Sequence, residues 1–229
     1  MVVCAAVVVG AAAVLLVWSV ASTREQRSSY SVGGALNGLS LDVGDADVVV
    51  EGAGRRGLIE VEHVDRYGFG HPVRATRSTG GGVFSIRSRC PRTILHGCSV
   101  SYRLRVPDNV PIAVRTGDGS VELEGYRGSA RIATGSGDID VRGFCGFALQ
   151  ARADDGGDVS AMTDCPPQQL RLRTTSGAVH ASVPAGRYQL DASTSGGSPS
   201  VSGVSAVADA PFAIQAVSGS GAVVVEGRR

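Results

Sequence analysis

The sequence contains no lysine: all 22 of its basic residues are arginine, and they nearly balance 21 acidic residues. This near neutrality provides no overall positive potential, which argues against a nucleic-acid-binding role. Aromatic residues make up only 5% of the chain. After residue 22 no window has apolar residues at helical spacing together with a helix cap. These absences exclude a helical or α/β fold for most of the chain.

Glycine is abundant instead, with 32 residues, and much of it lies in a repeated motif. The motif is first clear as Thr116-Gly117-Asp118-Gly119-Ser120-Val121 and returns as Thr134-Gly135-Ser136-Gly137-Asp138-Ile139. Successive copies are 18, 20, 20, 20 and 24 residues apart when counted between their anchor glycines, Gly119, Gly137, Gly157, Gly177, Gly197 and Gly221. A period near 20 residues is typical of stacked coils, each of which buries its apolar face against the next.

Within each period, apolar and polar residues alternate on both sides of the glycine turn, which indicates half-buried strands. The residues expected to face inward are Ile112, Val114, Leu170, Leu172, Ile214 and Ala216 before the turn and Val121, Leu123, Ile139, Val141, Val179, Ala181, Val223 and Val225 after it. Those expected to face outward include Arg115, Glu122, Glu124, Asp140, Arg142, Arg171, Arg173 and His180. The pattern predicts an all-β, parallel β-solenoid with coils of about 20 residues.

The turn glycines are predicted to be required because a corner between stacked strands needs φ > 0, which glycine adopts at little cost. One coil departs from the pattern. Leu149, Ala151 and Ala153 are one residue out of step with the following turn, which predicts a β-bulge there.

The N-terminal segment from Val2 to Ala21 is apolar except for Ser19, and it is long enough to cross a hydrocarbon core of about 30 Å. We therefore expect residues 1–21 to be a transmembrane helix. A cleavable signal peptide is the alternative, because Ser19-Val20-Ala21 supplies small residues for a cleavage site, and the domain would then be secreted. Residues 22–35 are predicted to be a tether and 36–229 the solenoid domain, with regular coils from about 111.

The charges beside this segment and the cysteines predict opposite locations for the domain. Arg24 and Arg27 follow the span and no basic residue precedes it, which alone would place the domain in the cytoplasm. Cys90, Cys98, Cys145 and Cys165 form an even set in a glycine-rich chain, which favours disulfides outside the cytoplasm. We give the cysteines more weight and expect an extracytoplasmic domain on the cell membrane.

The repeat also predicts which cysteines pair. Cys145 and Cys165 each lie eight residues after an anchor glycine, so they occupy the same place in successive coils. Strands about 4.8 Å apart bring such residues within disulfide range. The prediction is therefore Cys145–Cys165, which leaves Cys90–Cys98 to close a short loop. Four unpaired thiols are the alternative.

Candidate sites for chemistry are few. Asp154, Asp155 and Asp158 could hold calcium, although aspartate and glycine are also ordinary turn residues. Cys90 and Cys98 beside His96 could form only a partial zinc site. Ser136 and Ser176 lack the context of a hydrolase nucleophile, and His180 has no evident acidic partner. Polysaccharide-cleaving β-helices use outward carboxylates and basic residues on one wall, which could be imitated here by Asp140, Glu122, Arg115 and Arg142. We predict no enzymatic activity, no cofactor and no metal.

The glycine motifs, together with Tyr102-Arg103-Leu104-Arg105-Val106-Pro107 just before them, resemble those of the bacterial DUF4097 family, also catalogued as adhesins with β-strand repeats. The resemblance extends from about Leu36 to Glu226. It implies a membrane-tethered, right-handed parallel β-solenoid with no catalytic residues to carry over. The predicted function is adhesin-like: a non-enzymatic, membrane-anchored solenoid that presents its surface to an envelope protein or a cell-wall polymer. The alternative is a sensor or regulatory ectodomain in an envelope-stress pathway.

Overall fold

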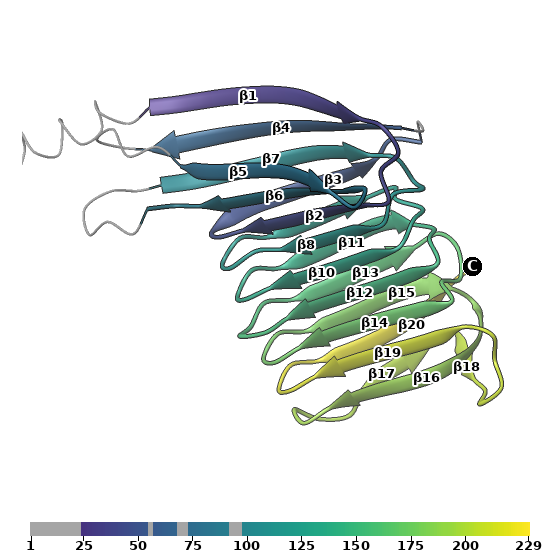
Figure 1. Cartoon of the computed structure of the whole chain (residues 1–229). Helices are drawn as coiled ribbons and strands as arrows, with labels where there is room; N and C mark the ends of the chain where they lie inside the picture. Colours follow the sequence, from purple (N-terminus) through teal and green to yellow (C-terminus); the bar gives the residue numbers. More distant parts are fainter. Residues whose placement is uncertain (1–23, 55–56, 68–72, 92–97) are drawn as a thin grey trace, which may run out of the picture.

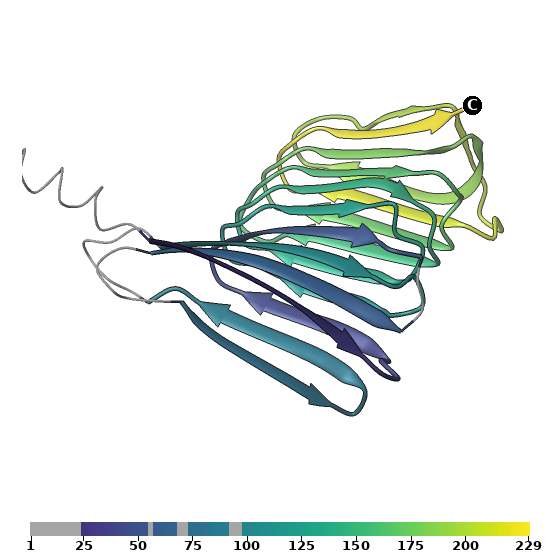
Figure 2. The same cartoon turned by 90° about the horizontal axis from the view of Figure 1, so that it is seen from above.

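A computed structural model of the chain describes residues 24–54, 57–67, 73–91 and 98–229. This part of the chain is all-β, and none of its residues forms a helix that could cross a membrane. The predicted transmembrane helix at residues 2–21 lies outside the described residues. Two ten-stranded sheets face each other and enclose the core between them (Figures 1 and 2).

Each sheet is a single row of mostly parallel strands. Sheet A has the order β1 (Arg24–Gly33), β4 (Leu58–Tyr67), β7 (Cys98–Val106), β3 (Ala46–Gly52), β9 (Val121–Glu124), β11 (Ile139–Phe144), β13 (Val159–Thr163), β15 (Val179–Pro184), β20 (Val223–Arg228), β17 (Ser200–Ser202). Sheet B has the order β18 (Val204–Ala206), β16 (Gly186–Thr194), β19 (Ala213–Ser218), β14 (Gln169–Thr174), β12 (Ala148–Ala153), β10 (Ala130–Thr134), β8 (Ile112–Arg115), β2 (Gly38–Val43), β6 (Val83–Arg89), β5 (Arg74–Gly80).

From β8 to β17 the chain alternates between the sheets, so each of these coils contributes one strand to sheet B and the next to sheet A. The predicted inward residues are buried and lie above one another from coil to coil. Val121, Ile139, Val159, Val179 and Val223, for example, form one column through sheet A. This stacking of apolar columns is what the two-residue alternation predicted. The right-handed sense of the coil stays a prediction.

The coils at both ends do not stack in sequence order. The last coil, β19–β20, lies between β14–β15 and β16–β17, so Gly221 approaches Gly177 and the coil that contains Gly197 is terminal. At the other end, β2–β3 lies between β6–β7 and β8–β9. Even spacing along the sequence suggested sequential stacking. It could not reveal that a later segment returns to fill a gap next to an earlier coil.

Antiparallel strands cover the N-terminal end of the stack (Figure 1). In sheet A, β4 pairs antiparallel with both β7 and β1, and in sheet B, β5 pairs antiparallel with β6. The prediction that residues 22–35 are a tether is therefore wrong, because residues 24–33 form an edge strand. Exposed and half-buried residues alternate in its second half, where Ser28, Tyr30 and Val32 are half-buried. Most of its residues are polar, so the sequence pattern did not indicate a strand.

Four of the six anchor glycines are needed for a different reason from the one predicted. Of the six anchor glycines, only Gly157 and Gly197 have positive φ, at 97° and 148°. A Cβ on Gly137 would lie 2.1 Å from the carbonyl oxygen of Gly119 in the neighbouring coil, and one on Gly177 would lie 1.9 Å from that of Gly157. The motif lacks side chains there because the backbones of neighbouring coils approach too closely to admit one.

The predicted bulge is not in β12: the one-residue mismatch lies in the turn that follows this strand. The pairing of β12 with both of its neighbours is regular, while β11 shifts register against β13 between Val141 and Phe144. Gly143, with φ of 64°, lies within this irregular stretch. This bulge is separate from the out-of-step residues. Leu149 pairs with Ala130 and Leu170, but Gly157 follows Leu149 by eight residues, whereas Gly137 and Gly177 follow those partners by seven, so the extra residue lies in the β12–β13 turn.

Both predicted disulfides are present. Cys145 and Cys165 lie at equivalent places in adjacent coils with their Cα atoms 4.8 Å apart, which is one strand spacing. Cys90 and Cys98 are linked with their Cα atoms 5.8 Å apart. This second bridge joins the end of the β6 segment to the start of β7, so it closes the loop within the N-terminal coil.

The threonine that begins each glycine motif forms a buried hydrogen-bond ladder. Thr134 Oγ1 lies 3.1 Å from the carbonyl oxygen of Gly119 and accepts a hydrogen bond from the Gly137 N–H at 3.0 Å. Thr174 and Ser218 make the same pair of contacts in their own coils. The hydroxyl thus bonds within its own turn and to the neighbouring coil.

We expect Thr134→Val to lower the free energy of unfolding by about 1–3 kcal/mol, because it leaves the buried Gly137 N–H without its acceptor. Thr163→Val is a matched control. Thr163 is fully buried, and its hydroxyl has no partner among the described residues, so its loss should be neutral or stabilising. Urea denaturation of both variants measures the difference. Equal losses in the two variants would contradict the ladder's role.

Candidate functional site

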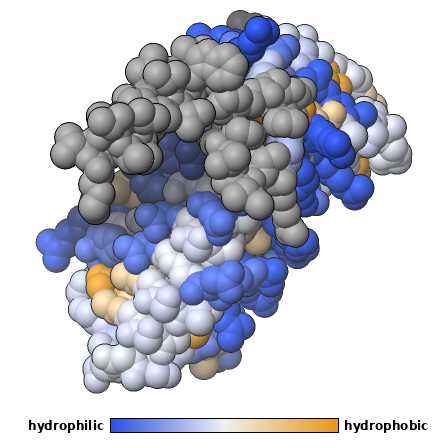
Figure 3. Space-filling view, turned by 90° about the vertical axis from the view of Figure 1, so that its left-hand side faces the viewer, coloured by the Kyte–Doolittle hydropathy of each residue, from blue (hydrophilic) through white to orange (hydrophobic). Residues whose placement is uncertain are grey.

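The outward side chains of the two sheets differ in how their charges are arranged. The interior is mainly apolar, so most functional candidates lie on the outer faces of sheets A and B. Among the described residues, exposed large apolar side chains come from four separate segments, at Leu58, Phe147, Met162 and Val201. Outside its grey atoms, Figure 3 shows a mainly hydrophilic or neutral face with only small, separate hydrophobic spots. No large apolar patch is therefore evident on that face.

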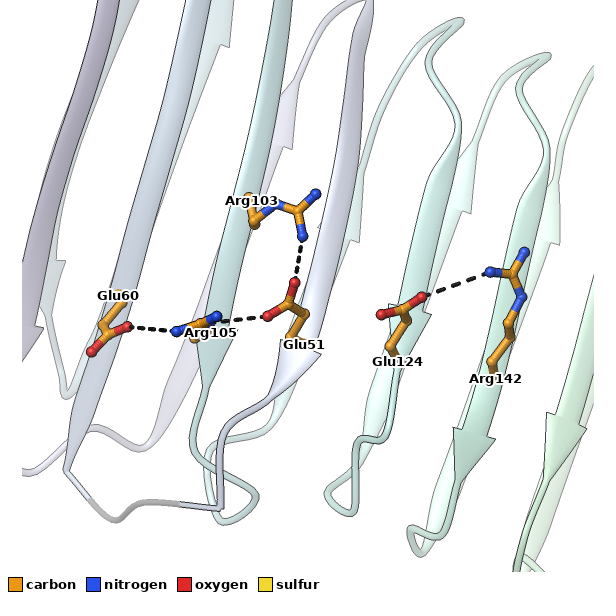
Figure 4. A network of polar contacts seen from close by, with 6 residues as sticks. All are labelled: Glu51, Glu60, Arg103, Arg105, Glu124 and Arg142. Carbon is orange, nitrogen blue, oxygen red and sulfur yellow. Dashed lines mark hydrogen bonds and ion pairs between the residues drawn. The ribbon is translucent and has the colours of Figure 1, made fainter.

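On sheet A, acidic and basic side chains neutralise one another across neighbouring strands (Figure 4). Glu51 on β3 contacts Arg103 at 2.5 Å and Arg105 at 3.0 Å, both on β7, and Arg105 also lies 3.9 Å from Glu60 on β4. Partial burial acts to raise the pKa of Glu51, but the hydrogen bonds and charges of the two arginines outweigh it and lower that pKa. The carboxylate therefore stays ionised and paired.

A second group on sheet A is centred on Arg142 of β11. Its guanidinium lies 3.0 Å from Glu122 and 3.7 Å from Glu124, both on β9, and it contacts Asp140 on its own strand. The nearby charge of Asp140 is the main reason that the pKa of Arg142 is raised. We call this face, defined by Glu51, Glu60, Arg103, Arg105, Glu122, Glu124, Asp140 and Arg142, the paired surface.

The outer face of sheet B carries a cluster of arginines on successive strands. We call it the arginine surface and define it by Arg115 on β8, Arg131 on β10, Arg152 on β12, and Arg171 and Arg173 on β14. Strand register sets them in two rows along the stack. One row runs Arg115, Ala133, Arg152, Arg173, and the other runs Ala113, Arg131, Gln150, Arg171, Gln215.

Most of these arginines lack acidic partners. Arg152 lies 3.3 Å from Asp154, and Arg131 donates to the side-chain oxygen of Gln150 at 3.2 Å. Within the part of the chain that the structure describes, Arg115, Arg171 and Arg173 have no carboxylate within 4.0 Å. Their positive charges therefore remain available to an anionic partner.

A shallow groove of about 470 Å³ follows the arginine surface. Its floor includes Ala133, which points outward yet is only 7% exposed. Register places Arg115 on one side of Ala133 and Arg152 on the other, with Arg131 two residues away on the same strand. The small alanine side chain leaves a hollow between three guanidinium groups.

The four charged residues predicted to share one wall do not all come together. Glu122, Asp140 and Arg142 meet on sheet A, but Arg115 lies on sheet B and belongs to the arginine surface. The alternation of apolar and polar residues predicted that Arg115, Arg171 and Arg173 face outward. It did not predict that they lie in one cluster with Arg131 and Arg152, because the cluster depends on the register between strands.

Two of the aspartates considered for calcium binding make other contacts in and near the turns. Asp158 Oδ1 accepts the backbone N–H of Ala178 in the next coil at 2.7 Å, and Asp154 pairs with Arg152. Among the described residues, no three His, Cys, Asp or Glu side chains form a group that could hold a metal ion. Cys90 and Cys98 are joined to each other, and His96, the third member of the partial zinc site, lies outside the described residues.

The three residues considered for hydrolysis are surface groups with simple partners. Ser176 Oγ lies 3.4 Å from the carbonyl oxygen of Asp155. Ser136 Oγ donates to Asp118 at 2.7 Å in the neighbouring turn. His180 does have an acidic partner, contrary to expectation: its Nε2 lies 3.3 Å from Glu226 on β20. The sequence could not reveal this pair because β20 returns to lie beside β15. Both side chains are nearly half exposed, as in an ordinary surface ion pair.

A polar cluster that the sequence did not suggest lies between the sheets near their N-terminal end. The His63 ring stacks on Tyr102 with centroids 5.6 Å apart and meets the edge of Tyr30, and its Nε2 lies 3.8 Å from Asp65. The Arg77 guanidinium on β5 lies 4.0 Å from the Tyr30 ring centroid. Burial is the main cause that lowers the pKa of His63, and the charge of Arg77 adds to it, while Asp65 opposes it.

We therefore expect stability to fall on mild acidification. A lowered pKa means that the folded state binds a proton on His63 less readily than the unfolded state, so stability is lost as the pH falls below the ordinary value of 6.5. Burial raises the pKa of Asp65, which acts in the opposite direction in a more acidic range. The test is the free energy of unfolding of the wild type and of His63→Gln between about pH 7.5 and 5.5. The wild type should lose more stability than the variant, and parallel curves would contradict this.

The fold and its surfaces define a class: a stack of two-stranded β-coils with charged outer faces and an apolar interior. Within this class the chain belongs to the Toastrack DUF4097 family, whose model matches residues 110–226, just over half of the chain. This confirms the resemblance carried by the glycine motifs. A comparison with curated proteins gave no match.

Several solved structures are similar over most of their length. A "putative cell adhesion protein" from Clostridium sporogenes is 10% identical, with a TM-score of 0.45, covering 90% of this chain and 100% of that one. A "putative adhesin" from Bacteroides fragilis is 8% identical, with a TM-score of 0.47 and coverage of 90% and 97%. A "putative lipid binding protein" from Parabacteroides distasonis is 12% identical, with a TM-score of 0.37 and coverage of 89% and 97%.

Proposed function

We propose that the protein is a non-enzymatic, membrane-anchored module outside the cytoplasm that binds a macromolecule of the cell envelope in an adhesin-like manner. The observation that carries this proposal is the arginine surface. Four of its five guanidinium groups have no acidic partner among the described residues, whereas all three arginines of the paired surface contact carboxylates. A surface of this kind favours an anionic partner over self-pairing.

Two further features support the location. The bridges Cys90–Cys98 and Cys145–Cys165 suit an oxidising compartment. Residues 2–21 provide an apolar stretch long enough to anchor the chain. Protease added to intact cells should digest the domain without prior lysis. Digestion only after lysis would place the domain inside the cell and remove this part of the proposal.

Binding is tested with the purified full chain, kept soluble in a mild detergent and mixed with isolated envelope material. The wild type should sediment with that material. Arg171→Gln/Arg173→Gln should remain in the supernatant, because it removes two unpaired charges from the arginine surface. The matched control, Arg103→Gln/Arg105→Gln, removes the same number of arginines from the paired surface and should sediment like the wild type. Equal retention of both double variants would contradict the proposal.

A further inference from the structure

The arginine surface is elongated along the stack of strands and does not form a closed pocket. Its side chains project from four consecutive strands of sheet B, β8, β10, β12 and β14, so they span three strand spacings, about 14 Å. Within one row, Arg115 and Arg152 are two strands apart, about 10 Å, with the hollow at Ala133 between them. A partner that meets all of these groups must be extended along the stack and carry negative charges at intervals of several ångströms.

The surface lacks the features that nucleic acid or a membrane would require. None of the outward residues on β8, β10, β12, β14 and β19 is aromatic, so it has no platform on which bases could stack. The chain has a formal net charge of only +1, which provides little attraction for the dense charge of a duplex. Anchoring in lipid uses a continuous apolar face, whereas the groove is lined by arginine and glutamine around small apolar residues.

Neutral hydrogen-bonding groups are interleaved with the charges. Gln150 lies beside Arg131 in the second row, and Gln215 follows Arg171 on the next strand. Gln150 Oε1 accepts a hydrogen bond from Arg131, and Gln215 Nε2 donates one to Asp191 at 2.9 Å. The N–H donors of Gln150 and the carbonyl oxygen of Gln215 remain for sugar hydroxyls, while guanidinium groups bind carboxylates in a planar, two-pronged geometry. Alternating arginine and glutamine therefore fits a polymer that carries both acid groups and hydroxyls.

We infer that the arginine surface binds a linear acidic polysaccharide, which runs along the stack across β8, β10, β12 and β14. This inference rests on the proposed function and specifies its partner. The carboxylates of the polymer contact Arg115, Arg171 and Arg173, and its hydroxyls contact Gln150 and Gln215. The hollow at Ala133 receives one acid group between Arg115 and Arg152.

The test uses polygalacturonate as the probe, with the purified full chain in mild detergent. The wild type should bind it, and the affinity should fall by about tenfold or more between 50 and 200 mM salt, because several charge contacts release counterions. Arg171→Gln/Arg173→Gln should lose about tenfold or more in affinity, and Arg103→Gln/Arg105→Gln should stay within about twofold of the wild type. Digalacturonate, which is too short to span the strands, should bind much more weakly than the polymer.

Several results would overturn the inference: no binding of polygalacturonate, equal losses in the two double variants, or binding of DNA or anionic phospholipid vesicles as tight as that of the polymer. Thermal melting of each variant checks that it is folded. The two proposals fail separately. If envelope material retains the chain through Arg171 and Arg173 but polygalacturonate does not bind, the partner class is wrong and the binding function stands. If neither binds, both are wrong.

Discussion

Gly137→Ala is expected to destabilise the fold by about 3 kcal/mol or more, and the variant should be largely unfolded if the wild type is marginally stable. The added methyl group would lie 2.1 Å from the carbonyl oxygen of Gly119 and 3.0 Å from the Ser120 nitrogen in the neighbouring coil. Both are backbone atoms, so no side-chain rotation relieves the clash. Thermal melting and urea denaturation followed by circular dichroism measure the loss.

Gly80→Ala is the matched control. Gly80 ends the edge strand β5, its φ is not positive, and an added Cβ would have no other heavy atom within 4 Å. This variant should stay within about 0.5 kcal/mol of the wild type. A wild-type melting curve for Gly137→Ala would show that neighbouring coils are not in close backbone contact at the motif.

Removal of the Cys145–Cys165 bridge, through Cys145→Ser/Cys165→Ser, should cost about 3 kcal/mol. The bridge closes a segment with a sequence separation of 20 and so restricts the unfolded chain. It also joins two adjacent coils in the middle of the stack, where each coil depends on its neighbours. The free energy of unfolding in urea, without reductant, measures the effect.

Cys90→Ser/Cys98→Ser provides the comparison, because its bridge spans a sequence separation of only 8. The chain-entropy argument gives it a somewhat smaller cost. Reductant should lower the stability of the wild type toward that of a variant lacking all four cysteines, and it should leave that variant unchanged. If reductant has no effect on the wild type, the bridges do not stabilise the protein.

The period of the glycine motif predicted the architecture because a repeated turn fixes where every strand begins. Both the alternation of inward residues and the equivalence of Cys145 and Cys165 follow from that period. The physical role of the glycines could not be predicted in the same way. A requirement for positive φ and a requirement for close backbone approach both select glycine, and only the positions of atoms in the neighbouring coil distinguish them.

Two other features depended on contacts that the sequence does not encode locally. The insertion of β19–β20 beside β14–β15 pairs His180 with Glu226, residues that are far apart under sequential stacking. The edge strand β1 alternates mainly polar residues, so its composition resembles that of a tether. In both cases the partner strand determines the structure, and a local pattern does not identify that partner.

The candidate site was predictable residue by residue but not as a unit. Alternation alone shows that Arg115, Arg171 and Arg142 face outward. Whether each is neutralised depends on which strand lies beside it. Arg142 lies next to Glu122 and Glu124 on β9 and pairs with them. Arg115 lies between Ala133 on β10 and Asp42 on β2, and Asp42 pairs with Arg89 instead. The register between strands therefore separates a self-neutralised surface from one available to a partner.

We propose that the arginine surface, and not the paired surface, contacts a partner in the cell envelope. Photo-crosslinking in living cells distinguishes the two surfaces, with a photoreactive residue at Gln150 on sheet B or, as a control, at Ser160 on sheet A. We predict that Gln150 crosslinks to a cell-wall polymer and that Ser160 gives no consistent adduct. A consistent membrane-protein adduct at Gln150 would favour a regulatory ectodomain. Adducts at Ser160 but not at Gln150 would contradict the account.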